Sequence, residues 1–131
     1  NSSVIQAGRL TVNVGTFNQT ASGQLLASDA FVGTGGNWIN DGLIASDGAM
    51  TLTLEGAYSG NGRASSLGAF DLQASRMKLA EAASIAGGAQ TDIDIDGVLE
   101  NQGRLTSVAD LIVTAGELTN GGTLGSRLKL T

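Results

Sequence analysis

The chain of 131 residues contains no cysteine, no histidine and no proline, and only 4% of its residues are aromatic. Without His or Cys it can form no Ser-His-Asp triad, no cysteine nucleophile and none of the usual N/S zinc ligand sets. The lack of proline is typical of a fold in which nearly every strand is central, because proline removes a hydrogen-bond donor from a sheet. The sequence has no apolar run of 18 residues, so we expect no membrane insertion.

Charge is sparse and scattered. Twelve acidic and seven basic residues give a net charge of −5 and a pI near 4.4. A nucleic-acid interface needs a concentrated basic stripe. Of the seven bases, only Arg76 and Lys78 share one face of an expected strand. We therefore expect no nucleic-acid partner.

The most informative feature that is present is a repeat of about twenty residues. Four segments align, beginning at Gly36, Gly56, Gly97 and Gly116. They share Gly in the first position, a large apolar residue in the third, mostly Asn in the fifth, Gly in the seventh and Ser in the eleventh. A degenerate copy is placed at Met77, which puts Leu79, Ala83, Ile85, Ile93 and Ile95 on odd positions. A fixed period of this size indicates stacked units, each too small to bury its apolar face alone.

The pattern inside each unit predicts strands. Apolar residues alternate with polar ones in Met50–Leu54, Phe70–Ala74 and Leu111–Ala115, and a period of two is typical of a strand with one buried face. No stretch of ten residues keeps the helical i, i+3, i+4 pattern. Gly and Asn interrupt the alternation at regular places, where we expect them to supply positive φ at tight corners.

These patterns predict an all-β fold, a right-handed parallel β-helix (β-solenoid) of about six coils, with the coils about 4.8 Å apart. Leu10, Val12 and Val14 are expected to end a coil as Met50, Leu52 and Leu54 do, and Phe17 falls in the column of Trp38 and Tyr58. Residues 1–131 are predicted to be one β-helical segment and a fragment of a much longer rod.

The repeated motif resembles the filamentous haemagglutinin repeats of bacterial two-partner-secretion exoproteins. "GVLENQGRLTS" from Gly97 and "GELTNGGTLGS" from Gly116 carry the resemblance best, and it covers roughly residues 15–131. The resemblance implies a long right-handed β-helical rod on a Gram-negative surface. Members act as adhesins or haemagglutinins, or as the stick of contact-dependent growth-inhibition toxins.

The function expected from this resemblance is a non-catalytic shaft that extends a distal binding or toxin domain from the cell. The family's secretion-domain signature of Asn-Pro type is absent, and so is any non-repetitive toxin sequence. The resemblance implies a secreted or cell-surface location, outside the outer membrane. It also implies receptors on host cells or neighbouring bacteria, and an outer-membrane transporter during export. Exposed strand edges at the two ends would favour end-to-end self-association of the fragment.

A second class remains open, a carbohydrate-active or carbohydrate-binding parallel β-helix. Its candidate acids are Asp92, Asp94 and Asp96, which alternate along a strand about 6.6 Å apart. In the simpler interpretation Ile93 and Ile95 point inward and the three acids face water. The run DIDIDG also resembles the start of a calcium loop, but the twelfth position is Gly103 instead of Glu, so at most weak Ca²⁺ binding is expected. We predict no catalytic, cofactor or metal residues, and no required cofactor.

The remaining motifs favour structure over chemistry. Asn40, Asn101 and Asn120 are expected to stack as a ladder of amides from coil to coil, and Trp38 and Tyr58 are expected in the core. Asn1 and Asn18 begin N-glycosylation sequons, which we interpret as unmodified turn residues. The S-x-x-K run at Ser75 lacks its partner signatures, and the glycine-rich stretch 33–38 opens no helix that could hold a phosphate.

Overall fold

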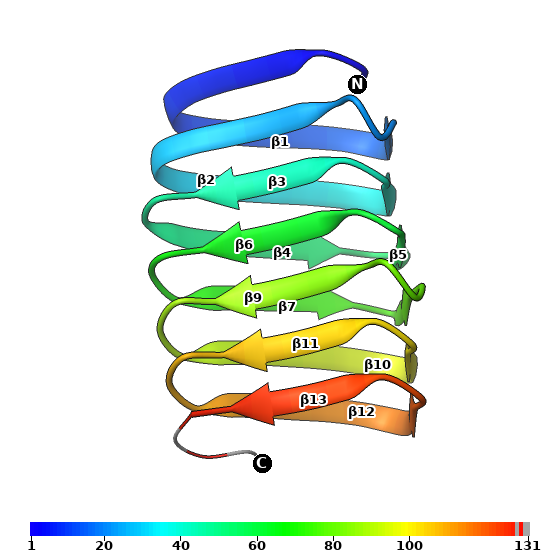
Figure 1. Ribbon diagram of the computed structural model, residues 1–131. Coiled ribbons are helices and arrows are strands. Elements are labelled where there is room, and N and C mark those ends of the chain that lie inside the picture. The colour runs from blue at the N-terminus through cyan, green and yellow to red at the C-terminus, as the bar shows by residue number, and fades with distance from the viewer. Residues whose placement is uncertain (128, 130–131) are drawn as a thin grey trace.

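The computed structural model describes residues 1–127 and 129, and these form a single right-handed coil of parallel strands. In Figure 1 the chain runs leftward along the front strands and rightward along the back strands while it descends from the N-terminus, which is a right-handed path. Every strand pairing is parallel. The predicted fold class is confirmed. The strands are β1 (Val4–Gln19), β2 (Gln24–Asn40), β3 (Leu43–Ser46), β4 (Ala49–Leu54), β5 (Ala57–Gly60), β6 (Arg63–Ser66), β7 (Phe70–Ala74), β8 (Arg76–Leu79), β9 (Ser84–Gly87), β10 (Thr91–Asn101), β11 (Arg104–Ser107), β12 (Leu111–Asn120) and β13 (Thr123–Ser126).

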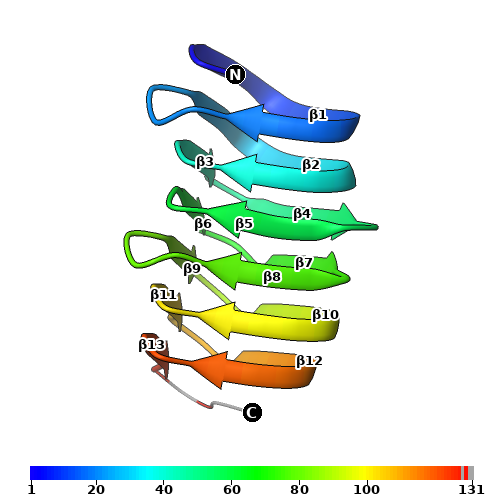
Figure 2. The same cartoon turned by 90° about the vertical axis from the view of Figure 1, so that its right-hand side faces the viewer.

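Each coil has three faces. The front face of Figure 1 contains β3, β6, β9, β11 and β13, and the back face contains β4, β7 and the first halves of β10 and β12. The side face, which is turned to the viewer in Figure 2, contains β5, β8 and the ends of β2, β10 and β12. Long strands such as β10 bend from the back face into the side face, with a register irregularity between Ile95 and Val98.

The coils stack in the register that the repeat predicts. The third-position residues pair in one column: Phe17, Trp38, Tyr58, Met77, Leu99 and Leu118. Leu10, Val12 and Val14 lie in the columns of Met50, Leu52 and Leu54, as expected for the end of a coil. The inward residues form one continuous core, in which Trp38 is 0% and Tyr58 1% exposed. Both aromatic rings are therefore core residues and offer no platform for stacking a sugar.

The fourth coil begins two residues earlier than its sequence suggests. Met77 pairs with Tyr58 and Leu99, so it occupies the third position and the coil starts at Ser75. The prediction that Met77 is the first residue was wrong, because this coil lacks the marker Gly and carries two extra residues at its next corner. The corner from Leu79 to Ala83 corresponds to the three residues from Asn101 to Gly103 in the fifth coil.

The corners do not use positive φ as expected. Gly60, with φ of 122°, is the one residue in the described part of the chain with positive φ, and no Asn adopts it. Most corner glycines are needed for close approach instead. A Cβ on Gly103 would lie 2.3 Å from the carbonyl oxygen of Ala83 in the coil before. The repeated Gly therefore reflects the tight stacking of corners more than their backbone conformation.

Candidate functional site

A ladder of buried polar side chains follows the corner between the side face and the front face. The Asn101 side chain is fully buried and donates from Nδ2 to Oδ1 of Asn120 at 3.0 Å and to the carbonyl oxygen of Thr123 at 2.8 Å. Its own Oδ1 accepts from the backbone N–H of Gly103 at 3.1 Å. The predicted stacking of Asn101 on Asn120 is confirmed.

The predicted ladder is not continuous, however. Asn40 accepts from Gln19 at 2.9 Å and donates to the hydroxyl of Tyr58 at 3.2 Å. The fifth position of the third coil is Gly60 and that of the fourth is Leu79, so no amide joins Asn40 to Asn101. Burial raises the pKa of Tyr58 to about 12, although the hydrogen bond from Asn40 offsets part of the rise. The Tyr58 hydroxyl is thus a neutral structural group that ends the first block of the ladder.

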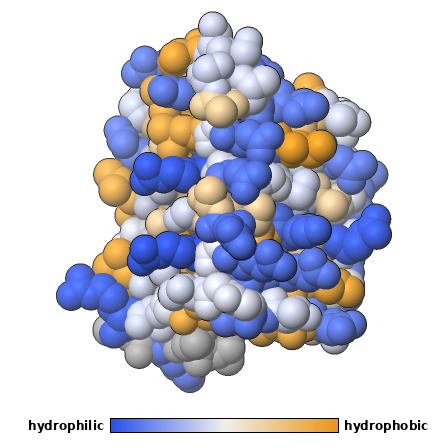
Figure 3. Space-filling view, turned by 45° about the vertical axis from the view of Figure 1, so that its right-hand side comes forward, coloured by the Kyte–Doolittle hydropathy of each residue, from blue (hydrophilic) through white to orange (hydrophobic). Residues whose placement is uncertain are grey.

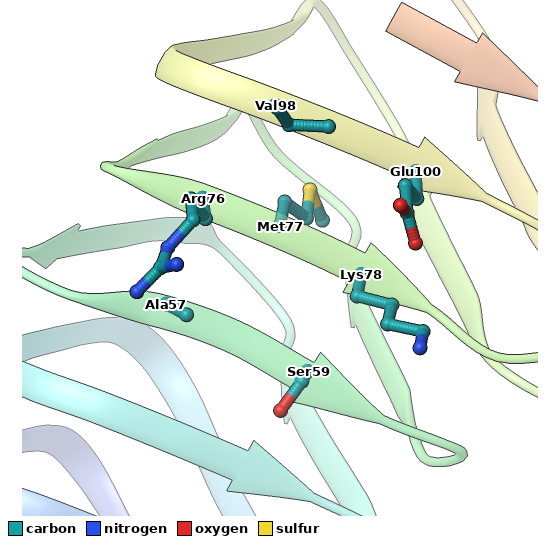
Figure 4. A pocket seen from close by; sticks show the side chains of 7 residues that line it. All are labelled: Ala57, Ser59, Arg76, Met77, Lys78, Val98 and Glu100. Atoms are coloured by element: carbon teal, nitrogen blue, oxygen red, sulfur yellow. The ribbon is translucent and has the colours of Figure 1, made fainter.

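The side face carries a groove with two basic side chains, which is drawn in Figure 4 and is called the basic groove below. Arg76 and Lys78 of β8 are both exposed, and they lie between β5 and β10. The groove has a volume of about 360 Å³ and is also lined by Ala57, Ser59, Met77, Val98 and Glu100. The Arg76 side chain extends toward β5 beside Ala57, and the Lys78 side chain extends toward the ends of β8 and β5, beyond Ser59.

The back face carries an acidic strip. Asp71 of β7 pairs with Asp92 of β10, and Gln73 pairs with Asp94. Partial burial raises the pKa of Asp71, and the carboxylates of Asp92 and Asp94 raise it further. Three like charges on neighbouring strand positions repel one another. Within the described residues, no group of three or more acidic, His or Cys side chains has the arrangement of a metal site.

Of the three candidate acids Asp92, Asp94 and Asp96, only the last two line the same depression. Ile93 and Ile95 point inward, at 0% and 1% exposed, so the aspartates lie on the outer surface as the simpler interpretation expected. Asp94 and Asp96 line a depression of about 160 Å³ with Gln73 and Thr53. Ligand pockets usually measure about 300–1,000 Å³, so this depression is small for a sugar chain.

Sequence reasoning missed Asp71 as the neighbour of Asp92, and Glu100 as the neighbour of Lys78. Both follow from the repeat once the fourth coil is aligned from Ser75. The other motifs lie in strands or, for Ser75, in the bend between β7 and β8. Asn18 is exposed at the end of β1, the Ser75 hydroxyl donates to the carbonyl oxygen of Glu55, and residues 33–38 belong to β2.

The surface around these sites is mainly hydrophilic. Figure 3, a view between those of Figures 1 and 2, shows hydrophobic residues as separate spots among hydrophilic ones. Away from the two ends of the stack, the most exposed large apolar side chains are Leu67, at 69%, and Val108, at 50%. Among the residues that the structure describes, no helix is long and apolar enough to cross a membrane.

A stack of short parallel strands with periodic Gly and Asn corners defines a β-solenoid repeat protein. The haemagglutinin repeat model matches residues 5–75 and 68–131, which together span nearly the whole chain. The chain therefore belongs to the haemagglutinin repeat family, and its β-solenoid fits a shaft like that of filamentous haemagglutinin. No curated protein and no solved structure matches the chain.

Proposed function

We propose that this chain is a non-catalytic structural and adhesive shaft segment of a secreted, surface-exposed exoprotein. The observation that carries the proposal is the even stack of coils. The third-position column runs unbroken from Phe17 to Leu118. Among the described corners between the side face and the front face, only Gln19–Gly23 and Leu79–Ala83 are longer than three residues. Binding sites on solenoids are usually built from insertions in one face, and the insertions here are two residues each. A rod of six coils adds about 29 Å of length.

The family implies the partners. We propose that the protein meets receptors on host cells or on neighbouring bacteria, and that an outer-membrane transporter of the two-partner type exports it. Antibodies raised against residues 1–131 should label intact source bacteria or their culture supernatant, and deletion of the adjacent transporter should remove that label. Label confined to permeabilised cells would refute the surface location.

A carbohydrate-active β-helix is the second candidate, and the depression between Asp94 and Asp96 is the observation in its favour. The chain should be assayed against acidic and neutral polysaccharides, with and without Ca²⁺. We expect no turnover. Turnover that Asp94→Asn removes would overturn the shaft proposal, and Thr53→Ser, on the same depression, is the matched control.

We also propose that the isolated chain self-associates end to end. In the described residues β1 pairs with β2 alone, and three of its side chains, Val4, Ile5 and Val14, are at least 38% exposed. At the other end Leu118 of β12 is 45% exposed. Leu128 and Leu130, which the sequence placed in the last coil, lie outside the described residues. Sedimentation over a concentration series tests this, and a monomer at millimolar concentration would contradict it.

A further inference from the structure

The basic groove and the acidic strip have matching geometry. Arg76 and Lys78 are two residues apart on β8, and Asp92 and Asp94 are two residues apart on β10. Alternate residues of a strand point the same way and lie about 6.6 Å apart. Each cation of the pair can therefore face one carboxylate when a side face lies against a back face.

The two surfaces also differ in what surrounds them. The outward residues of β4, β7 and the first half of β10 include three aspartates and no base. The guanidinium of Arg76 extends toward Ala57, the residue paired with it on β5, and Val98 lines the same groove from the β10 side. Because Ala57, the residue next to the guanidinium in Figure 4, is small, the groove leaves room for an approaching carboxylate.

We propose that the side face of one copy binds the back face of a second copy, with Arg76 and Lys78 against Asp92 and Asp94. The contact is heterologous, so in a pair one copy keeps its back face free and the other keeps its side face free, and further rods can line up side by side. This association differs from end-to-end stacking, which uses strand edges and no charged pair.

The area of the two faces determines how strongly two copies are expected to bind. A face about 15 Å wide and six coils high covers about 400 Å² per copy, half of the roughly 800 Å² that a stable interface uses. The contact between two chains of this length is therefore weak, and it grows with the number of coils. Experiments on the 131-residue chain must use millimolar concentration and low salt.

Zero-length carbodiimide coupling joins an amine to a carboxylate that touches it, and the chain has only two lysines, Lys78 and Lys129. Equal parts of ¹⁴N- and ¹⁵N-labelled chain should give mixed-isotope links from Lys78 to Asp92 or Asp94. The yield should fall at least about tenfold with Arg76→Glu, because like charges would then meet at the contact. The control combines Arg63→Glu and Arg104→Glu on the front face. Each of these changes alters the charge by as much as Arg76→Glu does, and together they should leave the yield of the cross-link unchanged.

A complementation experiment separates this contact from end-to-end stacking. Chains carrying Arg76→Glu and Lys78→Glu should not associate laterally, nor should chains carrying Asp92→Lys and Asp94→Lys. An equimolar mixture of the two should form heterodimers by sedimentation, and 0.5 M salt should dissociate them. Circular dichroism of each variant checks its fold, and Asp92→Asn with Asp94→Asn replaces any variant that does not fold. Lys78 linked only to Glu100 of its own chain, or an equal loss in the front-face control, would overturn the proposal.

Discussion

The fourth and fifth coils, Ser75–Asp96 and Gly97–Ala115, are neighbours that reach the same backbone path from different residues. The fifth coil keeps every repeat position, with Gly97, Leu99, Asn101, Gly103 and Ser107. The fourth coil keeps only the large apolar third position and places Ser75, Met77, Leu79, Ala83 and Gly87 in the same columns. Its strands nevertheless pair on both sides in the common register. Packing therefore needs the apolar third position, whereas other residues can take over the role of the repeated Gly, Asn and Ser.

Corner chemistry is the clearest compensation. In the fifth coil Oδ1 of Asn101 accepts from the N–H of Gly103, which closes a three-residue corner. In the fourth coil the side chain of Leu79 cannot accept a hydrogen bond, and the corner is instead closed by the backbone N–H of Ala83, which donates to the carbonyl oxygen of Ala80 at 3.0 Å. The first coil repeats the second solution, with Gly23 bonded to Thr20 at 3.0 Å. Both longer corners project from the same edge of the rod in Figure 2.

The largest effect is expected in the apolar column that the two coils share. Leu99 and Met77 are paired and at most 1% exposed. Leu99→Ala should lower the free energy of unfolding by about 2–5 kcal/mol, the usual range for a large-to-small change in a core. Denaturant melts followed by circular dichroism measure it.

Leu118→Ala is the matched control, since Leu118 pairs with Leu99 in the next coil but is 45% exposed. Its cost should be less than half of that of Leu99→Ala. The apolar third position of the repeat predicts that both leucines are buried, and this is wrong for Leu118 because none of the described residues forms a coil over it. Equal costs for the two changes would show that the column is not buried as described.

The second effect is the loss of the amide from the fifth coil. Asn101→Ala removes three hydrogen bonds and leaves the N–H of Gly103 without its acceptor. Stranding such buried groups should cost about 1–3 kcal/mol. Asn120→Ala, at the exposed end of the same pair, should cost less because water can replace the lost bonds. Wild-type stability for Asn101→Ala would refute the ladder.

The third prediction converts one corner into the other. Deleting Glu81 and Ala82 while changing Leu79→Asn and Ala83→Gly gives the fourth coil a three-residue corner, and the new amide can donate to Asn101. Leu79 is fully buried, so the reference is the same deletion with Leu79→Ala and Ala83→Gly, which loses the same leucine. The Asn variant should be more stable than this reference by about 1–2 kcal/mol, the value of one or two hydrogen bonds. If the reference is as stable, the Asn is not what closes a short corner.

The corners also separate the parts of the fold that the sequence pattern predicts from those that it does not. The alternation of apolar residues and the Gly, Asn and Ser positions were enough to predict the solenoid, its period and the column from Phe17 to Leu118. They did not predict the start of the fourth coil, because an insertion coincides there with the loss of the Gly, Asn, Gly and Ser of the repeat. Nor could they predict why Gly33 replaces an inward aliphatic residue. A Cβ on Gly33 would lie 2.5 Å from the ring of Trp38, a residue further along β2 whose side chain fills that space.

The fourth prediction concerns one hydroxyl in each coil, whose removal should stabilise the fold in the fourth coil and destabilise it in the fifth. Ser107 of the fifth coil donates to the carbonyl oxygens of Ala89 at 2.7 Å and Asp110 at 3.0 Å. Gly87 of the fourth coil has no side chain there, and the hydroxyl of Thr91 fills the space. This hydroxyl is buried and makes no hydrogen bond within the described chain.

Thr91→Val keeps the shape and removes the unpaired hydroxyl, so it should raise the free energy of unfolding by about 1 kcal/mol. Ser107→Ala should lower it by a similar amount. Parallel melts of the two variants and the wild type measure both changes. A destabilised Thr91→Val would mean that the hydroxyl has a partner, such as an ordered water.

The smallest effect concerns charge on the back face, where the fourth coil meets its two neighbours differently. Asp92 faces Asp71 of the third coil but Ile112 of the fifth. Because burial and the aspartates at 92 and 94 raise the pKa of Asp71 in the folded state, protonation of Asp71 favours folding. That stabilisation is complete below the unfolded pKa of 3.8 and is lost as the pH rises through the folded value. At pH 7 the ionised Asp71 therefore destabilises the fold.

Asp71→Asn should accordingly raise stability at pH 7 by about 0.2–1 kcal/mol, the range for a cross-strand pair of like charges, and should change it less at pH 3. Denaturant melts at the two pH values measure the difference. Asp96→Asn removes the same charge from the bend after Ile95, outside the Asp71–Asp92 pair, and reports the effect of net charge alone. A gain for Asp96→Asn equal to that for Asp71→Asn would show that general repulsion in a chain of charge −5, and not the facing pair, sets the balance.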